Sequence, residues 1–250
     1  MEGMMRGVSK WLVLAIILTF TMVGSAKAEE MKHMHKGHAA MEMHHFHVLI
    51  NHGMWMITEG ANMAMVAQMK MASGVDEKML QHGHHMMKAG KELIIAVLNG
   101  PEMKGMMDKH AKSPLMDYTH QLGESMLKVS DILDKMSMED MSAPDMMSMH
   151  HMHMMITHAL QMAAEGSNLM MLGEMGMAGA IDKMTIDHGK EMLNDGKSMV
   201  ADVMNGKEMM DMHAKGMTMD NPMMAMTHQL GEAATKVIDL LSNMPSVGSK

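Results

Sequence analysis

The sequence contains no cysteine in 250 residues, and only two Phe, two Trp and one Tyr. The absence of cysteine excludes disulfide bonds, covalently attached c-type haem, and zinc or iron–sulfur sites built from thiolates. A net charge of −8 and the lack of any basic patch with interleaved aromatic residues argue against nucleic-acid binding. No nucleophile elbow, phosphate-binding loop or cysteine nucleophile is present. We therefore predict a protein that is not an enzyme of the nucleophilic type and does not bind nucleic acid.

Methionine and histidine take the place of the missing residue types, with 49 Met and 19 His in the chain. Methionine replaces much of the Leu, Ile, Val and aromatic content that normally fills a core, although its flexibility makes it a poorly specifying core residue. The stretch MHHMHMMITHALQMAAEG (149–166) has nine Met or His among its eighteen residues. Packing alone does not require so many thioethers, so the composition points to ligand chemistry.

The first 28 residues are typical of a secretory signal peptide. A basic start, MEGMMRGVSK, precedes an apolar run over 11–23 that is short for a membrane span, and small residues occupy Ala26 and Ala28. Cleavage after Ala28 would remove a net charge of +2 and take the chain from −8 to −10. We expect a periplasmic or secreted bacterial protein with no stable membrane anchor after cleavage. In an oxidising compartment, thioether and imidazole ligands stay available where thiols would form disulfides.

The chain contains an internal duplication. A shift of 106 aligns His44–Met103 with His150–Met209 at 24 identities in 60 positions, of which only six are Met. After a slip in register, THQLGE (119–124) recurs at 227–232, with a shift of 108. We therefore expect a Met/His-rich segment at 29–40, a first lobe at 41–137, a linker at 138–145, a second lobe at 146–244 and a tail at 245–250.

Each lobe is predicted to be helical, because no segment alternates in the manner of a strand. In the first lobe the signals place one helix over 41–72, a second from Asp76 as N-cap to Asn99, a short third from Pro101, and a last from Pro114. The second lobe repeats these signals at Asp182, Asn205-Gly206 and Asn221-Pro222. The predicted fold is all-α, with two homologous antiparallel helical-bundle lobes.

One group of candidate metal ligands lies at helical spacing along the predicted helix faces. In the first helix of each lobe, a His and a Glu fall on an otherwise apolar stripe, where a buried ionisable group needs a partner. They are either hydrogen-bonded core residues or ligands of a metal site inside the bundle. The other helices add Met/His pairs at i,i+4 and Met-x3-His-x3-Glu rows. The ligands selected from this group are His52, Met56, Glu59, His82, Met86, His120, Glu124, His158, Met162, Glu165, His188, Met192, His228 and Glu232.

A second group of candidate ligands forms dense Met/His clusters, in which spacings of three and four residues bring side chains together on a helix. Met residues within 146–178 point in most directions around the helix, so some thioethers must face away from the core. This group comprises Met41, Met43, His44, His45, His47, His85, Met107, His110, Met149, His150, His151, Met152, His153, Met210 and His213. Soft thioether sulfur selects Cu(I) and, by the same logic, Ag(I), while imidazole adds competence for Cu(II).

The short pairs behind a secretion signal resemble those of exported bacterial Met/His-rich copper- and silver-binding proteins. The resemblance lies in Met-x-x-His and His-x-x-Met pairs: Met41/His44, His84/Met87, Met107/His110, Met147/His150 and Met210/His213. It implies sequestration of monovalent metal in the periplasm, which protects the cell or buffers its supply, with a copper exporter or chaperone as a partner.

Two other interpretations stay open on the sequence alone. Met/His axial ligation also occurs in haem-binding four-helix bundles, and a dinuclear iron or copper oxidase would require the His and Glu of the predicted stripes to converge. The predicted stripes only partly resemble the Glu and Glu-x-x-His pattern of di-iron bundles, because no Glu-x-x-His occurs at these positions. The last alternative is a structural or partner-binding protein that uses an adaptable Met surface without metal.

Overall fold

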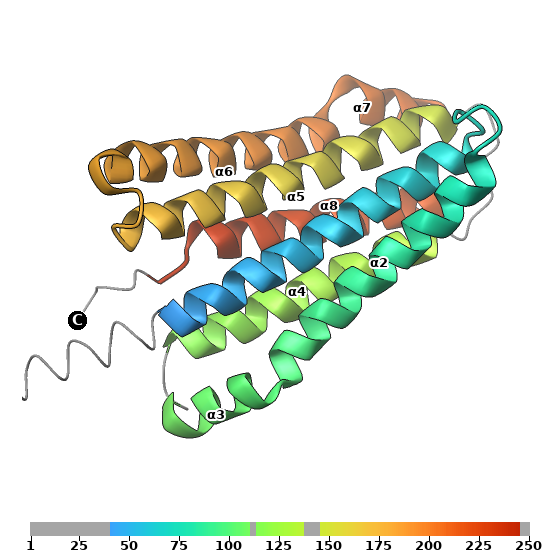
Figure 1. Ribbon diagram of the computed structural model, residues 1–250. Coiled ribbons are helices and arrows are strands. Elements are labelled where there is room, and N and C mark those ends of the chain that lie inside the picture. Colours follow the sequence, from blue (N-terminus) through green and yellow to red (C-terminus); the bar gives the residue numbers. More distant parts are fainter. Residues whose placement is uncertain (1–40, 111–113, 138–145, 246–250) are drawn as a thin grey trace, which may run out of the picture. The chain divides into compact units, whose positions relative to one another are not determined.

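The computed structural model describes residues 41–110, 114–137 and 146–245, and these residues contain helices and no strand. The protein is therefore all-α, as predicted. The first helix covers residues 41–68. The others are α2 (Asp76–Asn99), α3 (Pro101–His110), α4 (Pro114–Met136), α5 (Met146–Glu174), α6 (Asp182–Asn205), α7 (Lys207–Ala214) and α8 (Pro222–Ser242), with a short 3₁₀ turn, η1 (Gly179–Ile181), before α6 (Figure 1). The predicted signal peptide, the 29–40 segment, the linker and residues 246–250 lie outside the described residues.

The helix boundaries follow the sequence signals closely, with two corrections. The first helix ends at residue 68 instead of 72, because the Lys70 amide bonds to the Ala67 carbonyl and Lys70 takes a left-handed backbone with φ of 56°. Asp76 is not an N-cap of α2: its carboxylate accepts a hydrogen bond from the Ala72 amide at 2.9 Å, across the turn. Asn221 does cap α8, since its side chain accepts from the amides of Met223 and Met224.

Glycines bring the first two helices of each repeat into backbone contact. A Cβ added to Gly83 on α2 would lie 2.5 Å from the carbonyl oxygen of Gly60, and one added to Gly60 would lie 2.5 Å from that of Gly83. In the second repeat, a Cβ on Gly166 would lie 2.6 Å from the Gly189 carbonyl oxygen. Each repeat therefore begins with a tight helical hairpin, which Figure 1 shows for α5 and α6.

The two repeats pack against one another, and the described residues from His44 onwards form one compact unit. Asn51 on the first helix donates to the Asn168 side chain on α5 at 2.7 Å, and Thr157 on α5 donates to the Asn62 side chain at 2.7 Å. Asn51 near the start of the first helix pairs with Asn168 late in α5, whereas Asn62 further along the first helix pairs with Thr157 earlier in α5. The two helices therefore run antiparallel. The last helices, α4 and α8, also contact each other directly.

Equivalent positions of the two repeats make the same interactions. Lys91 pairs with Asp131 at 2.5 Å in the first repeat, and Lys197 pairs with Asp239 at 2.6 Å in the second. The two lysines are related by the shift of 106 and the two aspartates by the shift of 108. The folded repeats therefore share tertiary contacts as well as sequence identity.

The buried face of the first helix differs from the predicted stripe. Ile50, Met54 and Ile57 are fully buried, whereas His52 is exposed and stacks on Trp55 with ring centroids 5.8 Å apart. On α5, His158 and Glu165 are exposed as well. The predicted location of His52, His158 and Glu165 on a buried seam is wrong. Asn51, Thr58 and Thr157 lie on the buried faces instead, where they hydrogen-bond across the interface between the repeats.

Candidate functional site

The first turns of α5 bury a continuous set of methionine and histidine side chains. Met149, His150, Met152 and His153 have exposed fractions of 0%, 1%, 1% and 0%. Positions separated by three and four residues share a helix face, so these four side chains lie together on the inner side of α5. This is the densest buried group of thioether and imidazole side chains on one helix among the described residues.

A threonine fixes which nitrogen of His153 carries the proton. The Thr227 hydroxyl donates to the Met223 carbonyl at 2.8 Å, and it lies 2.7 Å from His153 Nε2. Since a hydroxyl has a single hydrogen, Thr227 accepts from His153, and the Nε2 of His153 carries the proton. Burial lowers the pKa of His153 to about 3, so its ring is neutral and Nδ1 holds a lone pair. That Nδ1 is buried and has no hydrogen-bond partner.

His150 is a buried histidine with neither ring nitrogen hydrogen-bonded. Its ring centroid lies 6.4 Å from that of His153, and burial lowers its pKa. A buried polar group without a partner destabilises a fold by about 1–3 kcal/mol. A neutral imidazole in this state fits metal ligation, because its lone pair is available and no protein group competes for it.

The short helix α7 lies over this end of the second repeat (Figure 1). His151 Nδ1 on α5 is 3.5 Å from a carboxylate oxygen of Glu208 on α7, and the rings of His213 on α7 and His228 on α8 have centroids 5.6 Å apart. Four further methionines on these two helices are buried: Met209, Met212, Met223 and Met224. The starts of α5 and α8 and the whole of α7 thus gather thioethers and imidazoles at one end of the bundle.

The first repeat has the same histidine geometry with aromatic neighbours. His47 Nε2 lies 2.7 Å from the Thr119 hydroxyl, and burial lowers the pKa of His47 to about 3. Tyr118 meets the His47 ring edge-on at 5.3 Å, and burial raises the pKa of its phenol. Phe46 is buried where the second repeat has Met152. The first repeat therefore offers fewer soft ligands near its buried histidine.

The remaining predicted ligands are distributed over the surface and the interface. The structure buries Met43, His47, Met149, His150, Met152 and His153. It half-buries His44, Met56, Glu59, Met86, His120, Met162, Met192 and His228. It exposes Met41, His45, His52, His82, His85, Glu124, His151, His158, Glu165, His188, Met210, His213 and Glu232, and it does not describe the side chains of Met107 and His110.

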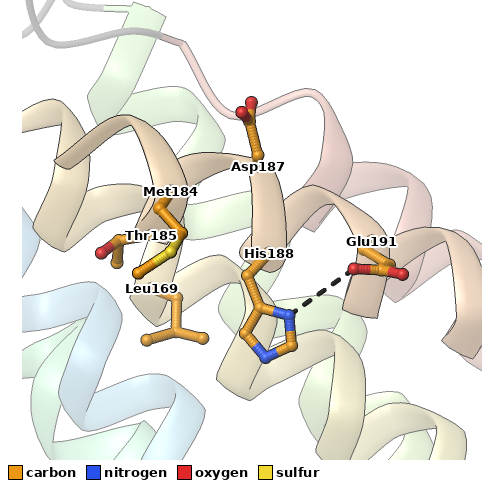
Figure 2. A pocket seen from close by; sticks show the side chains of 6 residues that line it. All are labelled: Leu169, Met184, Thr185, Asp187, His188 and Glu191. Atoms are coloured by element: carbon orange, nitrogen blue, oxygen red, sulfur yellow. Dashed lines mark ion pairs between the residues drawn. The ribbon is translucent and has the colours of Figure 1, made fainter. Parts of the chain in front are cut away.

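A shallow hollow of about 470 Å³ lies between α5 and α6. Figure 2 shows His188 beside Glu191, whose carboxylate is 3.7 Å from His188 Nδ1, while Asp187 points away from them. Asp187 pairs with Lys183, whose hydrogen bond lowers the pKa of that carboxyl. Met184 lines the same hollow with 63% of its surface exposed. The side chains around this hollow are more exposed than those of the buried turn of α5.

The described residues bring no three His, Asp or Glu side chains together in a metal-binding group. Glu59 instead lies 3.4 Å from the Gln161 amide, at the interface between the repeats. The dinuclear alternative would need such a convergence, so the described part of the chain gives it no site. A site that relies on thioethers needs no such group, because sulfur can complete the ligand set of a soft metal.

Several residues of this region were not among the candidate ligands selected from the sequence. Thr119 and Thr227 belong to the repeated THQLGE segment, and only the fold shows that they orient His47 and His153. Met209 precedes His213 by four residues, as Met224 precedes His228. That spacing was the available signal for the two methionines.

No family model matches the chain, and no curated protein or solved structure is significantly similar to it. None of the described helices has the length and apolar character needed to cross a bilayer.

Proposed function

We propose that the protein is a non-enzymatic periplasmic binder of copper, with Cu(I) as the preferred ion and Ag(I) and Cu(II) as further ligands. The supporting observation is the buried turn of α5, where His150 has two unpartnered nitrogens and His153 presents a free Nδ1. Met149 and Met152 supply buried thioethers on the same face. Bound metal would satisfy imidazole groups that the protein itself leaves without partners.

The chemistry of these ligands favours copper over zinc. Zinc sites are built mainly from Cys, His and carboxylates. This chain has no cysteine, and the carboxylates Glu124, Glu165 and Glu232 are exposed. Thioether and imidazole ligands without thiolate suit Cu(I) and remain usable in an oxidising compartment. The exposed Met/His clusters would then collect ions at the surface, for buffering or for delivery to a copper exporter or chaperone.

The test is an anaerobic titration of the purified protein with Cu(I) against a chromogenic competitor chelator. A variant carrying Met149→Leu, His150→Leu and Met152→Leu keeps the buried volume while removing three ligands. A matched control on the same helix, Met147→Leu with His158→Gln, changes exposed residues only.

We expect the wild type to hold copper against the chelator, the buried-site variant to hold one equivalent fewer than the wild type, and the control to hold as much as the wild type. A wild type that retains no copper would refute the proposed function. Equal losses in both variants would move the binding to the surface clusters.

A further inference from the structure

His213 on α7 and His228 on α8 are as far apart as two imidazole rings that bind the same metal ion. The ring centroids of His213 and His228 are 5.6 Å apart, with the ring planes inclined by 41°. A metal–nitrogen distance of about 2.0 Å implies centroid separations of roughly 5 Å for tetrahedral ligation and roughly 6 Å for linear ligation. The observed separation lies between these values.

The end of α7 fixes the tautomer of His213. Its Nδ1 lies 3.0 Å from the Met217 carbonyl oxygen, and a carbonyl can only accept, so Nδ1 carries the proton and Nε2 holds a lone pair. Gly216, with φ of 87°, and the bond from the Met217 amide to the Met212 carbonyl turn the chain back to place that oxygen. A ligating histidine typically donates its other ring N–H to such a carbonyl, which orients the ring.

His228 presents a matching nitrogen from α8. Its Nε2 is buried and has no hydrogen-bond partner, although the residue as a whole is only half-buried. Leaving such a nitrogen unpaired is unfavourable, and a cation shared with His213 would pair it. Nε2 is therefore the nitrogen that each ring would offer to a shared ion.

Each of these histidines follows a methionine by four residues. Met209 on α7 and Met224 on α8 are 2% and 0% exposed. Residues at i and i+4 lie one above the other on a helix, so each thioether shares a helix face with its histidine. Each helix thus presents a thioether and an imidazole on one face, and the two imidazole rings lie next to each other.

We propose that Met209, His213, Met224 and His228 form one copper site between α7 and α8, distinct from the buried turn of α5. The proposal rests on the proposed function and assigns to it a defined two-thioether, two-imidazole ligand set. Two sulfurs favour Cu(I), and the imidazoles allow the ion to be held without a thiolate. Metal at this site would tie the short helix α7 to α8, and so hold it over the start of α5.

A double-mutant cycle in the full protein tests whether the two histidines bind the same ion. The variants are His213→Gln, His228→Gln and their combination, with Met209→Leu/Met224→Leu as a volume-conserving variant that removes only sulfur. His188→Gln, an exposed histidine on α6, is the matched control. Cu(I) affinity is measured against a chelator, and circular dichroism checks the fold; His213 is exposed, so its variant keeps the site testable if His228→Gln misfolds.

We expect each single His variant to weaken one copper equivalent by at least about tenfold, since even the loss of a group that only orients a ligand has an effect of about this size. The combined variant should be no more than threefold weaker than the worse single variant, because a site already broken cannot be broken again. The methionine variant should weaken the same equivalent.

Additive losses of affinity from the two histidine variants would overturn the shared site while leaving copper binding by the protein intact. Wild-type affinity in all the histidine and methionine variants of the site, or a loss only in His188→Gln, would do the same. A wild type that holds no copper would overturn both proposals together.

Discussion

Two of the three buried histidines, His47 and His153, predict a marked loss of stability in mild acid. The pKa of His47 and that of His153 fall from 6.5 to about 3 in the folded protein, chiefly because burial disfavours the charged ring. Below pH 6.5 these two histidines are therefore protonated in the unfolded chain while they stay neutral in the folded chain. Their stabilising contribution is complete above pH 6.5 and is lost progressively as the pH falls toward 3.

The size of the effect follows from the pKa difference. At pH 5 each histidine lies 1.5 pH units below its ordinary pKa of 6.5, which corresponds to about 2 kcal/mol at 1.36 kcal/mol per unit. The pair should lower the free energy of unfolding by about 4 kcal/mol between pH 7.5 and pH 5. Domains of this kind are stable by only about 5–15 kcal/mol, so the change should be easy to measure.

Urea denaturation of the metal-free protein, followed by circular dichroism at pH 7.5, 6.5, 5.5 and 5, is the assay. His153→Gln should keep a hydrogen bond to Thr227 without titrating, and should lose about 2 kcal/mol less than the wild type between pH 7.5 and pH 5. His85→Gln, an exposed histidine on α2, should lose as much stability as the wild type. A wild-type free energy of unfolding that stays constant from pH 7.5 to pH 5 would refute the assignment of neutral buried rings.

Three further predictions concern packing, the cost of the site and processing. Gly83→Ala should lower the melting temperature, by roughly 2–4 °C for each 1 kcal/mol lost, because its Cβ would lie 2.5 Å from the Gly60 carbonyl oxygen. The control, Gly105→Ala, has no atom within 4 Å of its Cβ and should be neutral or stabilising by up to about 1 kcal/mol. If calorimetry shows Gly105→Ala to be the more destabilised of the two, the packing at Gly83 is contradicted. His150→Leu should stabilise the metal-free protein by about 1–3 kcal/mol in urea, since it removes an unpaired buried group, and a destabilised variant would argue for a hidden partner. Export from a bacterium with an outer membrane should yield a chain that begins at Glu29 by mass spectrometry, whereas an intact 27.7 kDa chain would contradict the predicted signal peptide.

The helices could be predicted from the sequence because the residues that start and stop them act locally. Gly100, Pro114 and the Asn221-Pro222 pair end or begin helices through backbone effects that need no knowledge of the fold. The exact end of the first helix depended on a left-handed Lys70, which the sequence does not announce.

The buried faces were harder to predict, because methionine occurs on every side of the helices. With Met both exposed, as at Met147, and buried, as at Met149, apolar periodicity loses its power to mark the core. Asn51 and Thr157 face the partner repeat and hydrogen-bond there, so polar residues also failed to mark the surface. The stripe through His52 was therefore misplaced.

The histidine-rich start of α5 was recognisable as ligand-rich from its composition, whereas the state of each ring was not. Only the fold shows that Thr227 sets the tautomer of His153 and that His150 has no partner. Pairing of His213 with His228 also depends on how the chain turns after α7. These hydrogen bonds and ring contacts depend on the distances between helices. The spacing of residues along one helix gives no information on those distances.

X-ray absorption at the copper edge, on protein loaded anaerobically with one equivalent of Cu(I), tests the central claim most directly. We predict a first shell that contains both sulfur and imidazole nitrogen, with the sulfur contribution falling in the Met149→Leu/Met152→Leu variant or in the Met209→Leu/Met224→Leu variant, according to which site fills first. A first shell of nitrogen and oxygen alone, unchanged in both variants, would contradict the account.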